Sequence, residues 1–330
     1  MISFIGRRLL IALLTLWALS VLSFVIIQLP PGDFVTTYIT YLTETGSDIS
    51  DAHAEHLRDL YGLNDPFHVQ YWKWLRQVLV GNLGISLEWR RPVTEVIGDR
   101  LALTMVVALA AMMFTWVLAL PIGIYSALRQ YSVADYVFTL IGYVGLAVPN
   151  FLLALVLMYV GFTQFDMNIG GLFSPEYATA QWSLAKAWDL AKHLPVAAVV
   201  IGLAGAARMI RIMRANLLDE LHKPYVVSAR ARGIPESRVI LRYPVRVALN
   251  PFASTLGYLF PLIVSGSIIV SIVLGLPTVG PLLLRALVAQ DMFLAGAIVL
   301  LLGVMTILGT LVSDLVLTWL DPRIRLEGQS

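Results

Sequence analysis

The sequence contains no cysteine, no phosphate-binding loop and little charge, and each absence removes a class of function. Without cysteine, the 330-residue chain forms no disulfide, no thiolate nucleophile and no cysteine-ligated metal or iron–sulfur centre. The pattern G-x-x-x-x-G-K-[ST] does not occur and no glycine is followed by lysine, so the chain cannot hold ATP phosphates in a P-loop. Charged residues make up 13% of the sequence, about half of the roughly 25% that is usual in soluble domains.

Hydrophobic residues instead make up 58% of the chain, and they recur in long runs. Runs of this length are typical of a protein that crosses a membrane several times. The first run follows Arg7 and Arg8 and is read as an uncleaved span, because it is long and no A-x-A-like cleavage site follows it. Six spans are predicted, over residues 9–29, 103–128, 136–162, 194–213, 252–274 and 293–320.

The distribution of charge predicts how these spans are oriented. Residues 208–246 carry nine Lys and Arg against three Asp and Glu, whereas residues 31–101 carry ten acidic against six basic residues. Because basic loops stay on the cytoplasmic side, both termini and the 208–246 block are expected in the cytoplasm, and segments 31–101 and 163–193 outside. Arg208, Arg211 and Arg214 recur every three residues and are expected to snorkel from one flank of a helix.

The fold class predicted is an all-α polytopic membrane protein with a helical external region between the first two spans. In that region, helices are expected over 51–61 and 69–79, followed by a turn at 81–86, and Pro92 is expected to open the next helix. Tyr71, Trp72 and Trp74 are suited to the membrane interface. The chain is divided into an N-terminal helix (1–30), this external segment (31–101) and a core of five spans (102–330).

Prolines and serines within the predicted spans suggest where a transport pathway could lie. Prolines 121, 149 and 261 interrupt spans, and broken helices often border a transport pathway, although an ordinary kink is the competing explanation. Ser267 and Ser271 are four residues apart and could line a polar passage. The candidate pathway residues are Pro149, Asn150, Ser265, Ser267 and Ser271.

Three other functions are weighed against this pathway reading. Ser265 and Ser267 would suit an intramembrane serine protease, but no histidine lies in a later span to serve as the base. Asp314 lies in the sixth span and would suit a proton-coupled carrier, or it pairs with an arginine near the membrane boundary. His53 and His56 share a helix face, but no further ligand accompanies them, so no metal site is predicted.

Residues 225–251 form a basic, polar segment, Tyr-Val-Val-Ser-Ala-Arg-Ala-Arg-Gly-Ile-Pro and onward, between two hydrophobic stretches. Each arginine at the centre of a bilayer costs roughly 2.5 to 3.5 kcal/mol, so this segment lies in water. It is therefore the place where the chain is expected to meet a soluble partner.

This segment resembles the cytoplasmic coupling motif E-A-A-x-x-x-G of ABC importer permeases. The matching positions are Val227, Ser228, Ala229 and Gly233. The sequence Ser-Ala-Arg-Ala-Arg-Gly is close to the T-A-R-A-K-G of the dipeptide/oligopeptide/nickel branch. The resemblance extends over nearly the whole chain. Further matches, in order, are Arg7-Arg8-Leu9-Leu10, Pro31-Gly32-Asp33, Tyr61-Gly62-Leu63-Asn64-Asp65-Pro66, Gly81-Asn82-Leu83-Gly84-Ile85-Ser86 and Asp321-Pro322-Arg323.

The resemblance implies that a short helix in this segment docks into a cleft on an ATPase subunit. Ala229 and Ala231 lack bulk for insertion, Gly233 can take a positive φ to end the helix, and Pro235 suits the first turn of the next helix. The arginines are expected to pair with acids on the ATPase or with lipid phosphates. The coupling residues so assigned are Ser228, Ala229, Arg230, Ala231, Arg232, Gly233 and Pro235.

The resemblance also implies partners and a location. ATP and Mg²⁺ would be bound by two partner ATPase subunits, so this chain is expected to hold no cofactor, to have no catalytic residue and to bind no nucleic acid. A second, similar permease and a periplasmic or extracellular solute-binding protein would complete an importer in a bacterial or archaeal cytoplasmic membrane, working by alternating access. Carriers of this branch take peptides, oligosaccharides, opines or nickel, so the substrate stays open, as does the role of the 163–193 loop.

Overall fold

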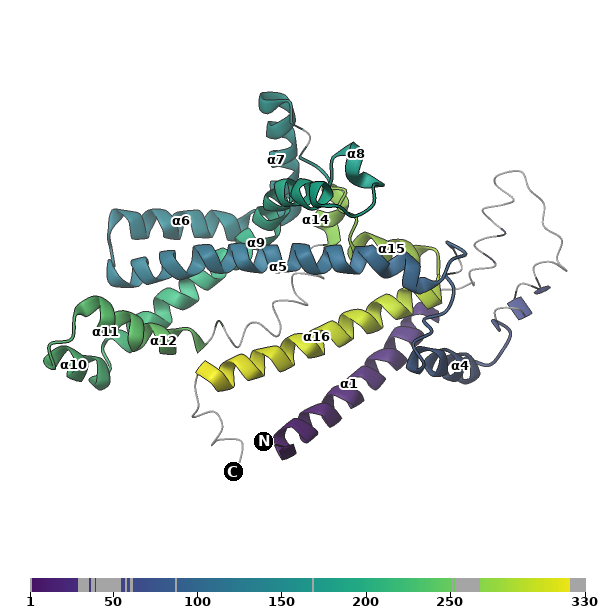
Figure 1. Ribbon diagram of the computed structural model, residues 1–330, viewed down its shortest axis with the longest axis horizontal. Coiled ribbons are helices and arrows are strands. Elements are labelled where there is room, and N and C mark those ends of the chain that lie inside the picture. Colours follow the sequence, from purple (N-terminus) through teal and green to yellow (C-terminus); the bar gives the residue numbers. More distant parts are fainter. Residues whose placement is uncertain are drawn as a thin grey trace. The chain divides into compact units, whose positions relative to one another are not determined.

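The computed structural model of the chain describes residues 2–28, 36, 39, 55, 56, 58, 59, 62–86, 88–167, 169–250, 252 and 268–320 (Figure 1). Over this part of the chain, the regular secondary structure is helical apart from one isolated β-bridge between Ile85 and Pro92. The helices with their bounds are α1 (Ile2–Gln28), α4 (Phe67–Leu79), α5 (Val93–Leu128), α6 (Val133–Ala147), α7 (Asn150–Phe165), α8 (Pro175–Ala178), α9 (Leu184–Leu221), α10 (Pro224–Ala231), α11 (Glu236–Arg242), α12 (Pro244–Ala248), α14 (Ile268–Val273), α15 (Val279–Val288) and α16 (Met292–Leu320).

The chain divides into two compact units. Unit 1 comprises Met1–Leu103 and Thr278–Met305, and unit 2 comprises Thr104–Pro277 and Thr306–Ser330. Each unit therefore combines segments that are distant in the sequence.

The core of unit 1 is aromatic. Phe24 of α1 lies edge-on to Tyr71 of α4, with 5.5 Å between ring centroids, and 6.2 Å from Trp74. The Tyr71 hydroxyl also shares a 2.8 Å hydrogen bond with Ser20 of α1. The helix predicted at 69–79 is confirmed and begins two residues earlier, but only Trp72, which is 61% exposed, could reach a membrane interface. Tyr71 and Trp74 are buried, because they lie on the face of α4 that covers α1.

A buried carboxylate organises the turn that leads into α5 in unit 1. Asp291 is fully buried and accepts hydrogen bonds from the Ser86 hydroxyl at 2.5 Å, from the Glu88 amide at 3.2 Å and from the Leu294 amide at 3.1 Å. The last of these bonds satisfies an unpaired amide in the first turn of α16. An unpaired buried charge is strongly unfavourable, and the hydrogen bonds from these three donors offset the cost of burying the carboxylate.

In unit 2, α9 packs against α5 and α6 through small residues (Figure 1). A Cβ placed on Gly202 of α9 would lie 2.8 Å from the carbonyl oxygen of Ala111 and 2.8 Å from the Phe114 ring. The Thr115 hydroxyl donates a 3.0 Å hydrogen bond to the Gly202 carbonyl across the same contact. Small residues permit this close approach of helix backbones, which is a common way of associating helices in membranes.

The third predicted span, residues 136–162, is not one straight helix. α6 and α7 meet at an angle of 101°, and the break falls at Val148 and Pro149. Proline lacks the amide hydrogen needed by a continuous helix, and its ring disfavours helical geometry at the preceding residue. Val148 accordingly has φ −82° and ψ 122°, which is extended backbone.

The helix that contains the fourth predicted span, residues 194–213, extends beyond that span at both ends. α9 has 38 residues and continues through Pro195, so it is about 57 Å long at 1.5 Å per residue. The loop predicted at 163–193 therefore narrows to the residues between α7 and α9, which include α8. A bilayer core is about 30 Å thick, so α9 extends well beyond the length needed to cross it.

The described part of the chain contains three helices that are long and apolar enough to cross a membrane, or four if the bent pair of α6 and α7 counts as one span. The three are Val93–Leu128, Leu184–Leu221 and Met292–Ser313. The first predicted span corresponds to α1, whose shorter apolar stretch is Leu10–Leu22. The fifth lies mostly outside the described residues, as do Pro261, Ser265 and Ser267. Six spans therefore stay a prediction.

Candidate functional site

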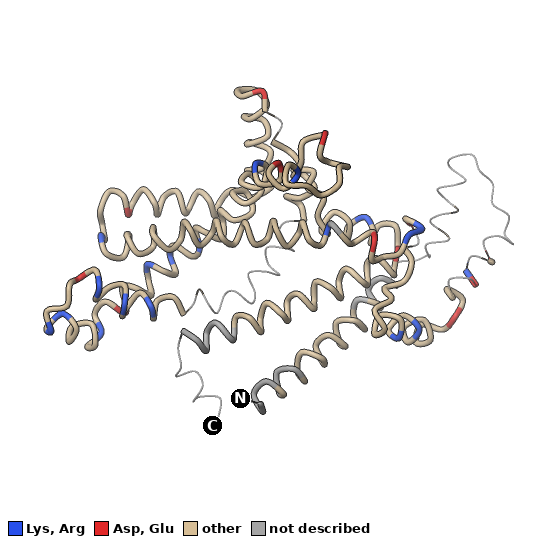
Figure 2. Tube along the Cα trace, viewed as in Figure 1, with Lys and Arg blue, Asp and Glu red and all other residues tan. Residues whose placement is uncertain are grey.

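The basic segment singled out in the sequence forms three short helices, α10, α11 and α12, directly after α9 (Figures 1 and 2). α12 packs against α9, α11 packs against α12, and α10 packs against α11. Lys and Arg gather on these helices and on the adjoining end of α9 (Figure 2). The exposed basic residues are Lys223, Arg230, Arg232, Arg238, Arg242 and Arg246.

The ends of α10 follow from its sequence. Pro224 occupies the first turn, where its missing amide hydrogen costs nothing. Gly233 has φ +73°, so the predicted positive φ after the helix is confirmed, and a Cβ there would meet no atom within 4 Å. Pro235 lies one position before α11 rather than in its first turn, with φ −54° and ψ 135°. The end of α10 at Gly233 thus agrees with the expectation, whereas the position of Pro235 differs from it by one residue.

One of the residues that the sequence assigns to coupling, Ala229, faces inward. Ala229 is 5% exposed, and with Val226 it packs against Val239 of α11, a contact joined by Ile234 and Tyr243. Val226 and Ala229 are three residues apart, so they share one face of the helix. Within this chain the small side chain of Ala229 lets α10 approach α11, and it is not presented for insertion into a partner.

The opposite face of α10 is open. Val227 is 55% exposed, and Ser228, Ala231 and Arg232 are also exposed. This face combines an aliphatic side chain, two small side chains and a cation, next to the turn at Gly233. A helix with so little side-chain bulk can enter a narrow cleft of another protein, with its backbone close to the cleft wall.

Arg230, for which the sequence suggests a partner on an ATPase or in lipid, has a partner within the chain. Its guanidinium donates to Glu236 of α11, with Nη2 2.7 Å and Nε 3.1 Å from Oε1. The hydrogen bond from Arg230 lowers the pKa of Glu236, and the hydrogen bond to Glu236 raises the pKa of Arg230. Both groups therefore stay charged at neutral pH.

A second polar contact joins α9 to α10. The Tyr225 hydroxyl donates to the Glu220 carboxylate near the end of α9. Burial, followed by this hydrogen bond, raises the pKa of Tyr225, so the phenol stays protonated and remains a donor.

The arginines along α9 do not behave alike. Arg214 pairs with Asp135 of α6, at 3.1 Å from Nε and 3.0 Å from Nη2, and Asp135 is only 3% exposed. Arg211 lies over the Tyr143 ring of α6 at 5.5 Å, and Arg208 is exposed. The prediction that all three snorkel to water is therefore wrong for Arg214, because α6 supplies a carboxylate where the sequence suggested a solvated flank.

The structure places three of the five candidate pathway residues. Pro149 and Asn150 lie at the break between α6 and α7, and Ser271 lies on α14, which packs against α7. Ser271 is 1% exposed, and its hydroxyl has no hydrogen-bond partner among the described residues. Most buried hydroxyls are hydrogen-bonded, so this one is an exception.

The described residues do not support a metal site at His53 or a proton-coupled carrier that uses Asp314. His53 lies outside the described residues, and the described part of the chain has no group of three or more His, Asp or Glu placed to hold a metal. Asp314 belongs to α16, but the surroundings of its side chain are not described.

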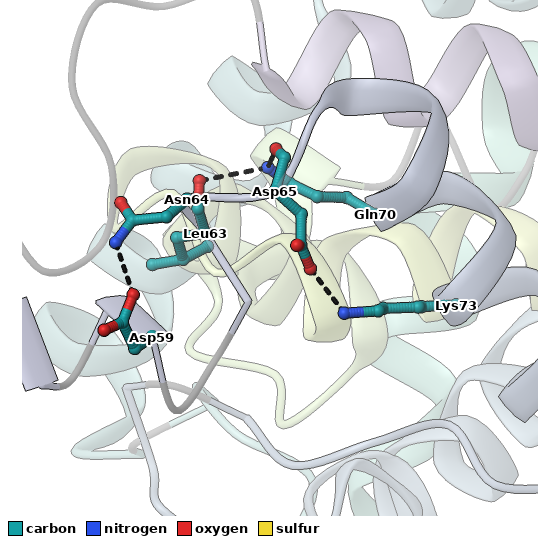
Figure 3. Close-up of polar contacts among 6 residues, drawn as sticks. All are labelled: Asp59, Leu63, Asn64, Asp65, Gln70 and Lys73. Carbon is teal, nitrogen blue, oxygen red and sulfur yellow. Dashed lines mark hydrogen bonds and ion pairs between the residues drawn. The ribbon is translucent and has the colours of Figure 1, made fainter.

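Residues 62–66, the described part of the matching motif at 61–66, have a local structural role (Figure 3). The Gln70 side chain donates to the carbonyl oxygens of Leu63 at 3.1 Å and Asp65 at 2.8 Å. Lys73 pairs with the Asp65 carboxylate. These bonds fix the turn onto the first turns of α4, so the motif positions that helix.

Sequence reasoning missed a polar cluster between α7 and α9. The amide and the hydroxyl of Ser174 both donate to Asp189 of α9 at 2.7 Å. Lys186 is 7% exposed, donates to the Ala180 carbonyl at 2.6 Å and lies 4.9 Å from the Phe173 ring and 5.1 Å from the Trp182 ring. The signal available was the spacing of Lys186 and Asp189 on one helix face. The cluster folds the connecting loop onto the start of α9.

Comparisons with known proteins cover both units. Residues 119–326 match the family described as binding-protein-dependent transport system inner membrane component, and residues 1–108 match its N-terminal model. Similar curated proteins include the oligopeptide transport system permease protein AppB of Bacillus subtilis, 33% identical over 325 residues, with 98% of this chain and 99% of the relative covered. OppB of Haemophilus influenzae is 31% identical over 98% of this chain and 100% of its own length.

A third relative, the glutathione transport system permease protein GsiC of Salmonella typhimurium, is 30% identical over 98% of this chain and 99% of its own length. Such permeases work with separate ATPase and substrate-binding subunits and lie in the bacterial inner membrane. The chain therefore belongs to the family of binding-protein-dependent transport system inner membrane components, as a helical permease subunit of an ABC importer.

Proposed function

We propose that α10 is the helix through which an ATPase subunit moves this permease, and that the cargo is a di- or oligopeptide. The observation that carries the first part is the open face of Val227, Ser228 and Ala231, which ends at the positive φ of Gly233. Arg232 lies next to this face, and Arg238 and Arg242 of α11 are also exposed, so the segment carries positive charge suited to acidic groups on a partner.

The second part of the proposal rests on the relatives. The curated proteins similar to this chain carry the names of oligopeptide, peptide or glutathione permeases, and all of these cargoes are peptides. Oligosaccharides, opines and nickel are the alternatives that the resemblance left open. The break at Pro149 and the buried Ser271 hydroxyl are the proposed border of the pathway.

The proposed assembly has two permeases, two ATPases and an extracytoplasmic binding protein. This chain contributes six spans with both termini in the cytoplasm. The excess of basic residues between 208 and 246 supports that orientation, because it places α10 on the side where ATP is available. Closure of the ATPases would displace α10 and shift the spans between outward-open and inward-open states.

The test of the docking proposal is Gly233→Asp in the complete transporter, reconstituted with its binding protein. Gly233 is exposed, and a Cβ there meets no atom within 4 Å, so the substitution adds only the backbone strain of an aspartate at positive φ and is expected to leave insertion and folding intact. Because its carboxylate lies beside the open face of α10, substrate-stimulated ATP hydrolysis and uptake should both be lost. Normal stimulated hydrolysis by this variant would refute the docking proposal.

Gly81 offers a matched control. It also has a positive φ, of +81°, and a Cβ on it also meets no atom within 4 Å, but it lies in unit 1. Gly81→Asp therefore adds the same charge with similar backbone strain, and it should retain coupled uptake. If both variants lose coupling alike, the effect is a general one and does not locate the docking helix.

The cargo is tested with the partner binding protein. Titration calorimetry against short peptides, oligosaccharides, opines and Ni²⁺ should show tight binding of peptides alone. Uptake should also continue when a protonophore is added at constant ATP, since the energy comes from ATP. Loss of uptake under those conditions would favour the proton-coupled carrier, for which Asp314 was the candidate residue.

A further inference from the structure

We infer that Arg230 is a positioning residue that ties α10 and α11 to the end of α9, so that these elements move together. This inference rests on the proposed function of α10 and specifies how displacement of that helix reaches the membrane. It assigns Arg230 an internal role, in contrast to the partner-facing role that its place in the motif suggests.

The contacts of one guanidinium carry the inference. Beyond its bonds to Glu236 at the start of α11, Arg230 directs Nη1 to the carbonyl oxygen of Leu221, the last residue of α9, at 3.5 Å. Carbonyl groups at a helix C-terminus lack partners within the helix, and a cation is favourable there. Glu236 lies in the first turn of α11, where a carboxylate is favourable for the same electrostatic reason.

The apolar contact beneath α10 does not reach α9 directly. Its buried residues are Val226, Ala229 and Val239, which join α10 to α11 and involve no residue of α9. α11 itself reaches the apolar cluster of α9 through Ile240, so the role left to Arg230 is to fix the direct relation of α10 and the start of α11 to the end of α9. Only His222 and Lys223 separate α9 from α10, so the chain limits the distance between the two helices but leaves their angle open. Polar side-chain contacts between the described residues of α9 and α10 include Arg230 to Leu221 and Tyr225 to Glu220.

The geometry also explains why arginine suits this position. A guanidinium is planar and rigid, and its five donors can engage a carboxylate and a carbonyl at the same time. A lysine presents a single flexible ammonium group and would not hold α9 and α11 in a fixed relation. The side chains of Arg230 and Glu236 are 41% and 55% exposed, so the pair contributes little to global stability. Removing it should therefore alter the orientation of α10 and leave the fold intact.

The absence of cysteine makes a direct test practicable. Spin labels on Ala215→Cys in α9 and Ser237→Cys in α11, both exposed positions, report the relation of these helices in the assembled transporter in nanodiscs. The wild-type pairing should give one narrow distance distribution. Arg230→Gln and Glu236→Gln should each broaden it at least twofold, and the charge swap Arg230→Glu with Glu236→Arg should restore it.

Function is measured on the same samples. Arg230→Gln should lower peptide uptake per ATP hydrolysed several-fold, with the KM for ATP unchanged, and the charge swap should recover most of the loss. Arg246→Gln is the matched control, because Arg246 is an exposed arginine of the neighbouring helix α12 with the same charge, and it is not among the arginines proposed to face the partner. It should leave the distance distribution narrow and uptake within about twofold of wild type.

Two results would overturn the inference. An unchanged distance distribution in Arg230→Gln would show that α10 and α11 are held by something else. A charge swap that restores the narrow distribution without restoring uptake would show that Arg230 contacts the ATPase directly. Neither result bears on whether α10 docks, because that question is decided separately by Gly233→Asp.

Discussion

The packing of α9 against α5 gives a prediction that can be worked from distances. In Gly202→Ala, the new Cβ would lie 2.8 Å from the Ala111 carbonyl oxygen and 2.8 Å from a carbon of the Phe114 ring. The oxygen belongs to a helix backbone, which cannot move as a side chain does. The two helices must therefore separate, and the 3.0 Å hydrogen bond from Thr115 to the Gly202 carbonyl lengthens with them.

The magnitude follows from a comparison with Gly142→Ala in α6. There the new Cβ would lie 3.8 Å from the Ala207 Cβ, an ordinary contact. Both substitutions gain about 0.8 to 1 kcal/mol from the higher helix propensity of alanine. Only Gly202→Ala incurs overpacking, which typically costs about 1 to 3 kcal/mol. The two variants should thus differ by about 1 to 3 kcal/mol in free energy of unfolding, with Gly202→Ala the less stable.

Equilibrium unfolding in mixed detergent micelles would measure this difference on the purified chain. Gly98→Ala provides a further control, since that helical glycine is exposed and a Cβ on it meets no atom within 4 Å. It should behave like Gly142→Ala. If Gly202→Ala were as stable as Gly142→Ala, the close contact between α5 and α9 would not be a feature of the folded protein.

Three further predictions concern carboxylates. Asp135→Ala should lower the free energy of unfolding by about 1.5 to 3 kcal/mol, since Arg214 loses a two-bond partner, and adding Arg214→Leu should recover part of the loss in the same unfolding assay. Asp291→Asn replaces one accepting oxygen with a donor and should cost about 1 to 3 kcal/mol, with faster hydrogen exchange at the Glu88 amide. Glu236 has a lowered pKa, so its contribution is full above the ordinary carboxyl pKa and is lost as the pH falls through the lowered one. The distance distribution between α9 and α11 should therefore be constant from about pH 6 to pH 8 and broaden only well below the ordinary carboxyl pKa of about 4.3.

The basic segment shows what could be predicted from the sequence. Its position, the end of α10 at Gly233 and the start of α11 after Pro235 follow from local rules about glycine and proline. The inward position of Ala229 could not be predicted, because the surface that it covers comes from α11. The partner of Arg230 was missed for a similar reason, since it depends on how the turn at Gly233 directs the next helix.

The prolines show where the fold could not be predicted from the sequence. Pro149 breaks the chain at 101°, whereas Pro195 lies inside the continuous helix α9. The two are alike in their local chemistry, so a sequence reading that breaks helices at proline is correct for one and wrong for the other. The difference arises from tertiary packing. Asp291 and Ser86 are a further example, because a hydrogen bond between residues 205 positions apart has no signal in a single sequence.

Because α9 is one continuous helix, the number of residues in it determines the direction in which α10 points. One helix runs from the loop anchored by Ser174 and Asp189 to the residue that contacts Arg230. Each added residue turns everything beyond it by about 100° and shifts it by about 1.5 Å. One inserted alanine would therefore point α10 in a different direction, while seven would return it to within about 20° of its original direction. Among related permeases, length changes should thus fall in the loops that flank this helix and spare the helix itself.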